Sequence, residues 1–287
     1  MNFLSDSLWF QWQAHTDVLI GLSLLLGVYL IGIGPIRARY NLAEEVSSQK
    51  IATFTTGVIV LAVAFTSPIH ILSEKYLFSM HMLQHVLITL IAPPLIILGT
   101  PDWLIRPLIK PSLALRLAKV LTNPFVAFAA FNLVFALWHI PELYNASLRH
   151  DGVHAAEHIL MISTAILAWW PLTSNLPELP RLAYHFQMGY LFFMSLAQII
   201  VFGVITFATE PIYNFYIDAP RVWGISALVD QQIGAIIMKV GGGLLFLTIL
   251  ISVFFKWAAQ EQNKDKLENE FRYAADFGSN ESPKGDI

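Results

Sequence analysis

Seven apolar stretches constrain what this chain can fold into more than any other feature of its sequence. A helix needs roughly 20 mostly apolar residues to cross a hydrocarbon core about 30 Å thick, and each stretch approaches that length. Turn-forming pairs such as Gly34-Pro35 and Ser67-Pro68 separate the stretches. The sequence therefore predicts an all-α integral membrane protein, a bundle of seven transmembrane helices, with spans at about residues 18–35, 51–69, 77–99, 124–140, 154–172, 183–208 and 228–257.

The composition agrees with a chain that is mostly embedded in a lipid bilayer. Hydrophobic residues make up 56% of the chain and charged residues only 13%, which is not the balance of a soluble domain. Nothing in the sequence resembles the basic surface that nucleic-acid binding requires. Cysteine is absent, which excludes disulfides, thiolate metal sites, iron–sulfur clusters and cysteine nucleophiles. Any metal must therefore be held by His, Met or carboxylate side chains.

The positions of Lys and Arg predict the orientation of the helices. If the N-terminus lies outside, thirteen of the 17 basic residues fall in inner segments and three in outer ones, while Lys239 lies within the last span. Such an excess is typical of the cytoplasmic side, so the C-terminus is predicted to be cytoplasmic and the protein to be a multi-pass cell-membrane protein.

This topology divides the chain into three parts. Residues 1–16 are predicted to be an extracytoplasmic or interfacial segment anchored by Trp9 and Trp12, without the basic start of a signal peptide. Residues 17–258 form the seven-helix transmembrane domain. Residues 259–287 are rich in Glu, Lys, Asp and Asn and are predicted to be a solvated, disordered cytoplasmic tail.

Histidines are concentrated on the predicted outer side, which holds eight of the nine. His81 and His85 are four residues apart on the third span, so their side chains lie one above the other on one helix face. His154 and His158 repeat this spacing on the fifth span. If these two helices are neighbours, four imidazoles meet in the outer half of the bundle, with His139, at the end of the fourth span, close by.

These side chains predict a copper site. Imidazole suits copper and zinc, and the thioethers of Met80 and Met82 favour Cu(I), although at most one of the two is expected to face the same site as His81. Glu157 and Asp230 are expected to support the ligands. The alternative interpretation, polar packing near the membrane surface, fits a single His pair better than it fits two pairs on one side. The weaker candidates, which water could satisfy, are His15, His70 and His150.

Enzymatic chemistry has little support in the sequence. His154-Ala-Ala-Glu157-His158 fits the H-x-x-E-H pattern of inverted zinc peptidases. That pattern specifies only three positions, however, and no clear distal third ligand segment of that class follows. The chain also has no nucleotide-binding loop and no nucleophile motif. We therefore expect a protein that is not an enzyme.

Longer segments point to a family. They follow one another from the third span to the seventh: Phe78-Ser-Met-His-Met-Leu-Gln-His85, Ala92-Pro-Pro-Leu95, Leu98-Gly-Thr-Pro101, Trp138-His-Ile-Pro141, His154-Ala-Ala-Glu-His158, Trp169-Trp-Pro171 and Asp230-Gln-Gln-Ile-Gly234. Together they resemble the CtaG family, the seven-span assembly factors of caa3-type cytochrome c oxidase. In the last span the family pattern has an aromatic residue and then a proline after the methionine, whereas Lys239 follows Met238 here.

The resemblance implies a role in the maturation of a haem–copper oxidase. The resulting hypothesis is a non-enzymatic assembly factor that binds copper on the outer side through some of the five histidines and hands it to an oxidase subunit. An unrelated single-span copper chaperone of the same name uses cysteines, so this chain cannot work in that way. The alternatives are a haem-binding membrane protein for electron transfer or haem handling and a copper transporter. Association into a homo-oligomer stays open.

Overall fold

The computed structural model describes residues 8–13 and 15–278, with side chains as far as residue 273. All regular structure in these residues is helical. Three π-helical turns, η2 (Gly32–Ile36), η3 (Leu87–Ile91) and η4 (Ile237–Gly241), interrupt long helices, and η1 (Leu8–Phe10) is a short 3-10 helix. The α-helices are α2 Thr16–Ile31, α3 Arg37–Tyr40, α4 Ser48–Thr66, α5 Pro68–Lys75, α6 Phe78–Val86, α7 Ala92–Gly99, α8 Asp102–Ile109, α9 Ser112–Leu121, α10 Pro124–Trp138, α11 Pro141–Arg149, α12 Asp151–Thr173, α13 Tyr184–Ala197, α14 Ile199–Thr206, α15 Asn214–Asp218, α16 Ala227–Ile236 and α17 Gly242–Gly278.

The described residues contain six helices that are long and apolar enough to cross a membrane: Thr16–Tyr40, Ser48–Thr66, Phe78–Gly99, Asp151–Thr173, Tyr184–Thr206 and Ala227–Tyr273. A seventh span results if α9 and α10, which are bent by 66° at their junction, count as one. α10 alone has 15 residues, a length of about 22 Å. An all-helical protein with six to seven candidate membrane spans is therefore confirmed, while the orientation stays a prediction.

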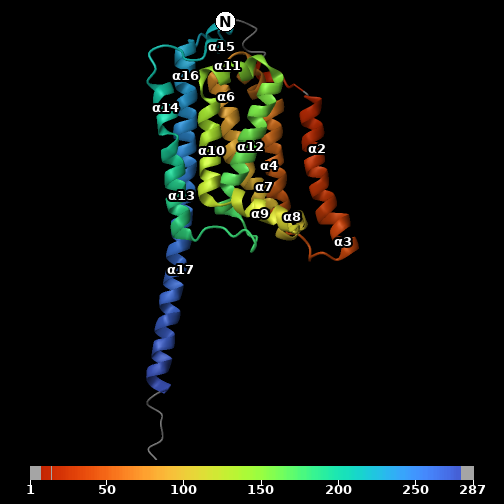
Figure 1. The fold of residues 1–287 in the computed structure, drawn as a ribbon, viewed down its shortest axis with the longest axis vertical. Coiled ribbons are helices and arrows are strands. Elements are labelled where there is room, and N and C mark those ends of the chain that lie inside the picture. The colour runs from red at the N-terminus through yellow and green to blue at the C-terminus, as the bar shows by residue number, and fades with distance from the viewer. Residues whose placement is uncertain (1–7, 14, 279–287) are drawn as a thin grey trace, which may run out of the picture.

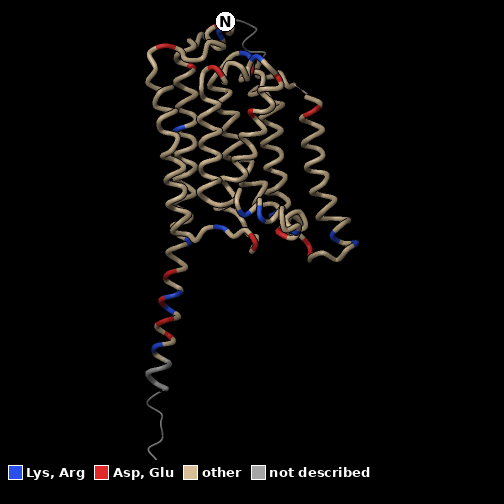
Figure 2. The backbone as a smooth tube through the Cα atoms, viewed as in Figure 1, with Lys and Arg blue, Asp and Glu red and all other residues tan. Residues whose placement is uncertain are grey.

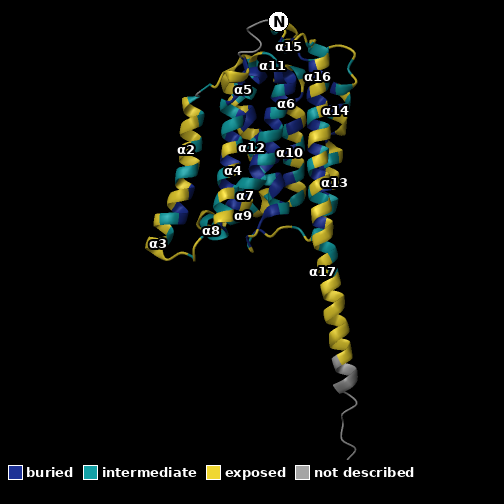
Figure 3. Cartoon of the chain, turned by 180° about the vertical axis from the view of Figure 1, so that it is seen from behind, coloured by how far each residue is buried: buried dark blue, intermediate teal, exposed yellow. Residues whose placement is uncertain are grey.

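The helices stand side by side in one bundle (Figure 1). The central helices are α4, α6, α7, α10 and α12, while α13, α14 and α16 cover one flank and α2 lies on the opposite flank. Buried residues gather in the central helices, whereas the projecting part of α17 is exposed (Figure 3). Lys and Arg collect at the end of the bundle where α3, α8 and α9 lie, and along α17 (Figure 2). The opposite end carries α5 and α11.

The third long helix, Phe78–Gly99, consists of α6, η3 and α7 and carries the first His pair. It contains a π-helical turn next to two prolines. Pro93 and Pro94 have no backbone N–H, so the carbonyls of Thr89 and Leu90 lose the partners that a regular α-helix would give them. The π-helical turn η3 accommodates this break. Trp169 Nε1 on α12 donates a hydrogen bond of 2.8 Å to the Thr89 carbonyl. The prolines thus help to fasten the third long helix to α12.

Two span ends differ from those expected. The helix that forms the second span ends at Thr66, because Ser67 accepts a hydrogen bond from Ile69 N and so caps a new helix. His70 therefore lies on the short helix α5 rather than at the end of a span. α10 ends at Trp138, and His139 is its C-cap residue.

The last helix also differs from expectation. α17 continues to Gly278, so the residues predicted to be a disordered tail from residue 259 are helical as far as the structure describes them. The reason is their composition: Ala, Gln, Glu, Lys and Arg favour helix, and no Pro interrupts the run. Within the preceding span, Lys239 Nζ donates a hydrogen bond of 2.8 Å to the carbonyl of Ser195.

Candidate metal site

The two His pairs meet between α6 and α12. Within each pair the spacing of four residues stacks the imidazoles on one helix face: the ring centroids of His81 and His85 are 4.3 Å apart, as are those of His154 and His158. Across the two helices, His81 lies 5.8 Å from His154 and 6.2 Å from His158, centroid to centroid. The four imidazoles therefore form one cluster, which we call the histidine cluster.

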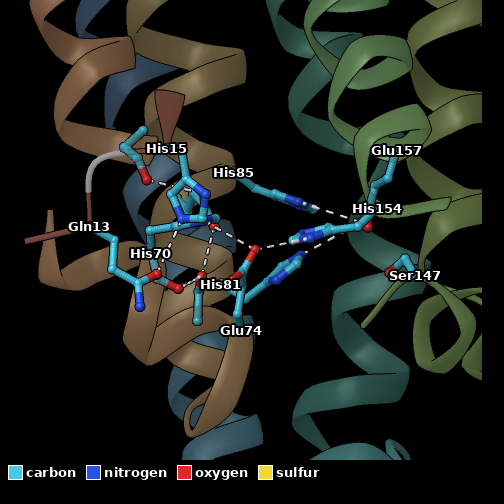
Figure 4. A network of polar contacts seen from close by, with 12 residues as sticks. Gln13, His15, His70, Glu74, His81, His85, Ser147, His154 and Glu157 are labelled. Atoms are coloured by element: carbon cyan, nitrogen blue, oxygen red, sulfur yellow. Dashed lines mark hydrogen bonds and ion pairs between the residues drawn. The ribbon is translucent and has the colours of Figure 1, made fainter. Parts of the chain in front are cut away.

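Glu157 adds a carboxylate to the histidine cluster. Its Oε1 lies 3.6 Å from His81 Nε2 and 3.5 Å from His85 Nε2, and all three side chains are fully buried. The sequence predicted only a supporting role for Glu157, but its oxygen lies among the imidazole nitrogens. Figure 4 shows His81, His85, His154 and Glu157 converging from the two helices.

The polar atoms of the cluster are largely unsatisfied. Both ring nitrogens of His81 and His85, Nε2 of His154 and His158, and both oxygens of Glu157 are buried without a hydrogen-bond partner. A buried polar group without a partner costs about 1–3 kcal/mol, more if charged, so proteins seldom retain one without a reason. Such a concentration of free nitrogen and oxygen atoms is the arrangement that a bound metal ion would satisfy.

Among the residues that the structure describes, two sets of three bring one donor atom each within 4.8 Å of one another: His81, His85 and His158, and His81, His154 and Glu157. His81 belongs to both sets. Imidazole nitrogen and carboxylate oxygen are donors that copper and zinc accept. The residues therefore fit a transition-metal ion, with no preference for one of these two metals.

The methionines are in apolar surroundings. Met82 is buried in a core cluster with Phe78 and Phe135, and Met80 packs against a smaller cluster that contains Leu72. Both thus have packing contacts that account for them, and a thioether ligand stays a prediction.

His139 and Asp230 lie outside both sets of donor atoms. His139 Nδ1 donates a hydrogen bond of 2.7 Å to the Phe135 carbonyl, while its Nε2 is buried without a partner. Asp230 accepts hydrogen bonds from the backbone N–H of Phe78 at 2.6 Å and of Ser79 at 3.2 Å. It therefore satisfies the free N–H groups at the start of α6 and supports the site by fixing the helix that carries His81.

Of the three weaker candidates, His15 and His70 lie in a polar network at the edge of the cluster (Figure 4). His70 Nε2 is 3.1 Å from Glu74 Oε1, and Glu74 Oε1 is 3.2 Å from His154 Nδ1. His15 packs edge-on against His70, with 4.6 Å between ring centroids. His150 is exposed at the end of α11.

Sequence reasoning missed Glu74. The signal that could have found it is its position four residues after His70, which puts both side chains on one face of α5. Burial lowers the pKa of His70 to about 4, although the charge of Glu74 opposes this. For Glu74, burial acts to raise the pKa, but the hydrogen bond from His154 and the nearby imidazoles outweigh it, so the pKa is lowered.

Tyrosines close the cluster on the side of α11 and α15. Tyr144 is fully buried, and its ring centroid is 5.1 Å from that of His81. Its hydroxyl lies 3.3 Å from that of Tyr216, which donates to the Ser73 carbonyl at 2.6 Å. Burial raises the pKa of Tyr144 well above its usual range, so it presents a neutral phenol ring to the cluster.

Comparison with known proteins decides the family. The model of the family described as cytochrome c oxidase caa3 assembly factor matches residues 27–260, most of the chain. The chain belongs to the CtaG family. The resemblance that its motifs predicted is thereby confirmed, and the matched range contains all five candidate histidines and Glu74.

The CtaG-family chain is also similar to mycobacterial proteins. Uncharacterized proteins of Mycobacterium bovis and Mycobacterium tuberculosis are each 22% identical to it over 258 residues, which cover 84% of this chain and 38% of theirs. An uncharacterized protein of Mycobacterium leprae is 22% identical over 268 residues, covering 85% of this chain and 39% of its own. The chain thus spans well under half the length of these relatives. No solved structure matches it significantly.

Proposed function

We propose that this CtaG-family protein assists the assembly of a haem–copper cytochrome c oxidase by binding copper in the histidine cluster and passing it to an oxidase subunit. The family supplies the assembly role. The observation that carries the copper part is the convergence of four imidazoles and Glu157, buried and mostly without hydrogen-bond partners. Copper is the cargo in this proposal, and the protein needs no enzymatic step.

The proposed ligands come from His81, His85, His154, His158 and Glu157, with His139 as a further donor nearby. Five donors exceed the four that a tetrahedral ion needs, and the two overlapping sets share His81. An ion can therefore exchange one ligand for another without leaving the cluster, which suits a carrier better than a storage site. Lys and Arg are in excess at the end of the bundle that carries α3, α8 and α9, which supports a cytoplasmic location for that end and an outward-facing histidine cluster. In this orientation residues 1–16 lie outside, residues 17–258 in the membrane and residues 259–287 in the cytoplasm.

The two alternatives fit the geometry less well. Imidazoles in mutual contact, with centroids 4.3 Å apart within each pair, suit a small ion rather than a macrocycle held between two axial ligands. A transporter would need ligands along the whole bundle. Beyond His85, however, the interior around Leu90, Phe131 and Trp169 is an apolar core cluster.

Deleting the gene tests the proposed function. We expect the oxidase of the deletion strain to contain its haem but to lack most of its copper, and to regain copper when the wild-type gene is restored. The measurement is the copper and haem content of the purified oxidase, with a strain carrying His185→Ala as the matched control, because His185, in the first turn of α13, belongs to neither set of converging donor atoms. An oxidase with its full copper content after deletion would contradict the proposal.

A further inference from the structure

Glu74 links the histidine cluster to the protein surface. Its Oε1 is shared by two imidazoles, at 3.1 Å from His70 Nε2 and 3.2 Å from His154 Nδ1 (Figure 4). The three residues come from two helices, α5 and α12, so the carboxylate connects the short helix α5 to the helix that carries the second His pair. The candidate ligand sets do not include Glu74, so its role needs a separate explanation.

The hydrogen bonds around His70 determine which of its nitrogens carries the proton. Gln84 Nε2 can only donate, and it lies 3.0 Å from the Ala64 carbonyl and 3.1 Å from His70 Nδ1. The Ala64 carbonyl can only accept, so it holds the amide with Nε2 toward Ala64 and His70 and Oε1 toward Ser73 Oγ, 2.8 Å away. His70 Nδ1 is therefore an acceptor, and its Nε2–H donates to Glu74. His70 thus orients the carboxylate and is not free to bind a metal through Nε2.

The same reasoning applies to His154. A carboxylate only accepts hydrogen bonds, so its contact with Nδ1 places the ring proton of His154 on Nδ1. The neutral ring then keeps its lone pair on Nε2, which is buried without a hydrogen-bond partner. Metal-binding histidines commonly donate their other N–H to a carboxylate, which fixes the ring and makes the metal-binding nitrogen more basic.

Glu74 and His154 are more exposed to solvent than His81 and Glu157, so this pair lies at the edge of the cluster. The side chains of His81 and Glu157 are 0% exposed, that of His154 is 11% exposed and that of Glu74 is 25% exposed. An ion that enters or leaves past Glu74 would meet His154 before the fully buried ligands.

We propose that Glu74 is the positioning residue that fixes the tautomer of His154 and so makes Nε2 of His154 the outermost ligand of the histidine cluster. The metal part of this inference rests on the proposed function. The tautomer part does not, because the contacts that fix it involve no metal. Glu74 acts through His154, which distinguishes it from the ligands themselves.

A double-mutant cycle tests whether Glu74 acts through His154. The full-length protein, purified in detergent, is titrated with Cu(I) in competition with a coloured chelator. Glu74→Gln is expected to lower the copper affinity about 10–100-fold. In a His154→Ala background, Glu74→Gln is expected to lower the copper affinity only about two-fold or less, because the residue through which Glu74 acts is absent. Equal losses in both backgrounds would overturn the proposal.

Two further variants separate positioning from general damage to the fold. Glu142→Gln alters an exposed glutamate on α11, at the same end of the bundle, and is expected to leave the copper affinity unchanged. Glu74→Asp keeps a carboxylate and is expected to restore part of the affinity lost in Glu74→Gln. An aspartate variant as weak as the glutamine variant, with an unchanged melting temperature, would count against a carboxylate role.

Nitrogen NMR on the metal-free protein, with labelled histidine rings, tests the tautomer without copper. We expect His154 to be protonated at Nδ1 in the wild type and to lose this preference in Glu74→Gln. A wild-type His154 protonated at Nε2 would overturn the inference. If the wild type shows the expected tautomer but binds no more copper than a variant without the histidine cluster, the copper function fails and the positioning of His154 stands.

Discussion

His81→Ala is expected to lower the copper affinity by roughly 100-fold or more, the largest loss from any single histidine change. His81 is the one residue common to both sets of converging donor atoms. Changes beside a ligand already cost about 10–100-fold in metal affinity, and loss of a shared ligand should cost at least as much. The measurement is competition between the purified variant and a chelator of known copper affinity.

The matched control for this prediction is His150→Ala. His150 is exposed at the end of α11, on the same predicted side as the cluster, and belongs to neither donor set. We expect it to bind copper like the wild type. If His81→Ala and His150→Ala bind copper equally well, His81 is not a shared ligand.

Asp230→Ala is expected to destabilise the fold by about 2–4 kcal/mol, more than the ~1 kcal/mol typical of a lost helix cap. Asp230 is 1% exposed and accepts hydrogen bonds from two buried backbone N–H groups, those of Phe78 and Ser79. Alanine would leave both groups without an acceptor in a region that water does not reach. The free energy of unfolding in mixed detergent micelles, measured as a function of denaturing detergent, gives the loss directly.

Two other variants calibrate this measurement. Asp230→Asn keeps one acceptor oxygen and is expected to lose less stability than Asp230→Ala. Asp17→Ala removes an exposed aspartate from the first turn of α2 and is expected to change stability by no more than about 0.5 kcal/mol. A loss for Asp230→Ala that is no larger than that for Asp17→Ala would show that the cap on α6 is unimportant.

Much of the fold could be predicted from the lengths of the apolar stretches. Six of the seven predicted spans correspond to single helices broken at most by a π-helical turn, and the sixth is interrupted at Gln198, between α13 and α14. The predicted fourth span coincides with α10 except for its last two residues, but α9, whose Arg116 and Lys119 were assigned to an inner segment between spans, was not predicted to be a helix. The helical continuation of α17 was missed for a different reason. Runs of Glu, Lys and Asn are found both in disordered tails and in solvated helices.

The histidine cluster was only partly predictable. The spacing of four residues predicted each pair, because it reflects the periodicity of one helix. That α6 and α12 lie side by side could only be assumed, and the structure confirms that they do. Contacts between segments distant in sequence, such as Glu74 with His154 or Phe78 with Asp230, leave no periodic signal in one sequence. The spacing of four residues from His70 could have indicated the contact of Glu74 with His70, but not its contact with His154. Asp230 was likewise expected to support an imidazole rather than a helix end.

The most direct test is the copper content of the purified protein compared with a variant in which His81, His85, His154 and His158 are all changed to alanine. Both are incubated with Cu(I) without oxygen, passed over a desalting column in the presence of a weak chelator, and analysed for metal. We expect the wild type to retain copper in a stoichiometric amount and the variant to retain none, with both proteins equally helical. Equal copper in the two proteins, or none in the wild type, would contradict a copper site in the histidine cluster.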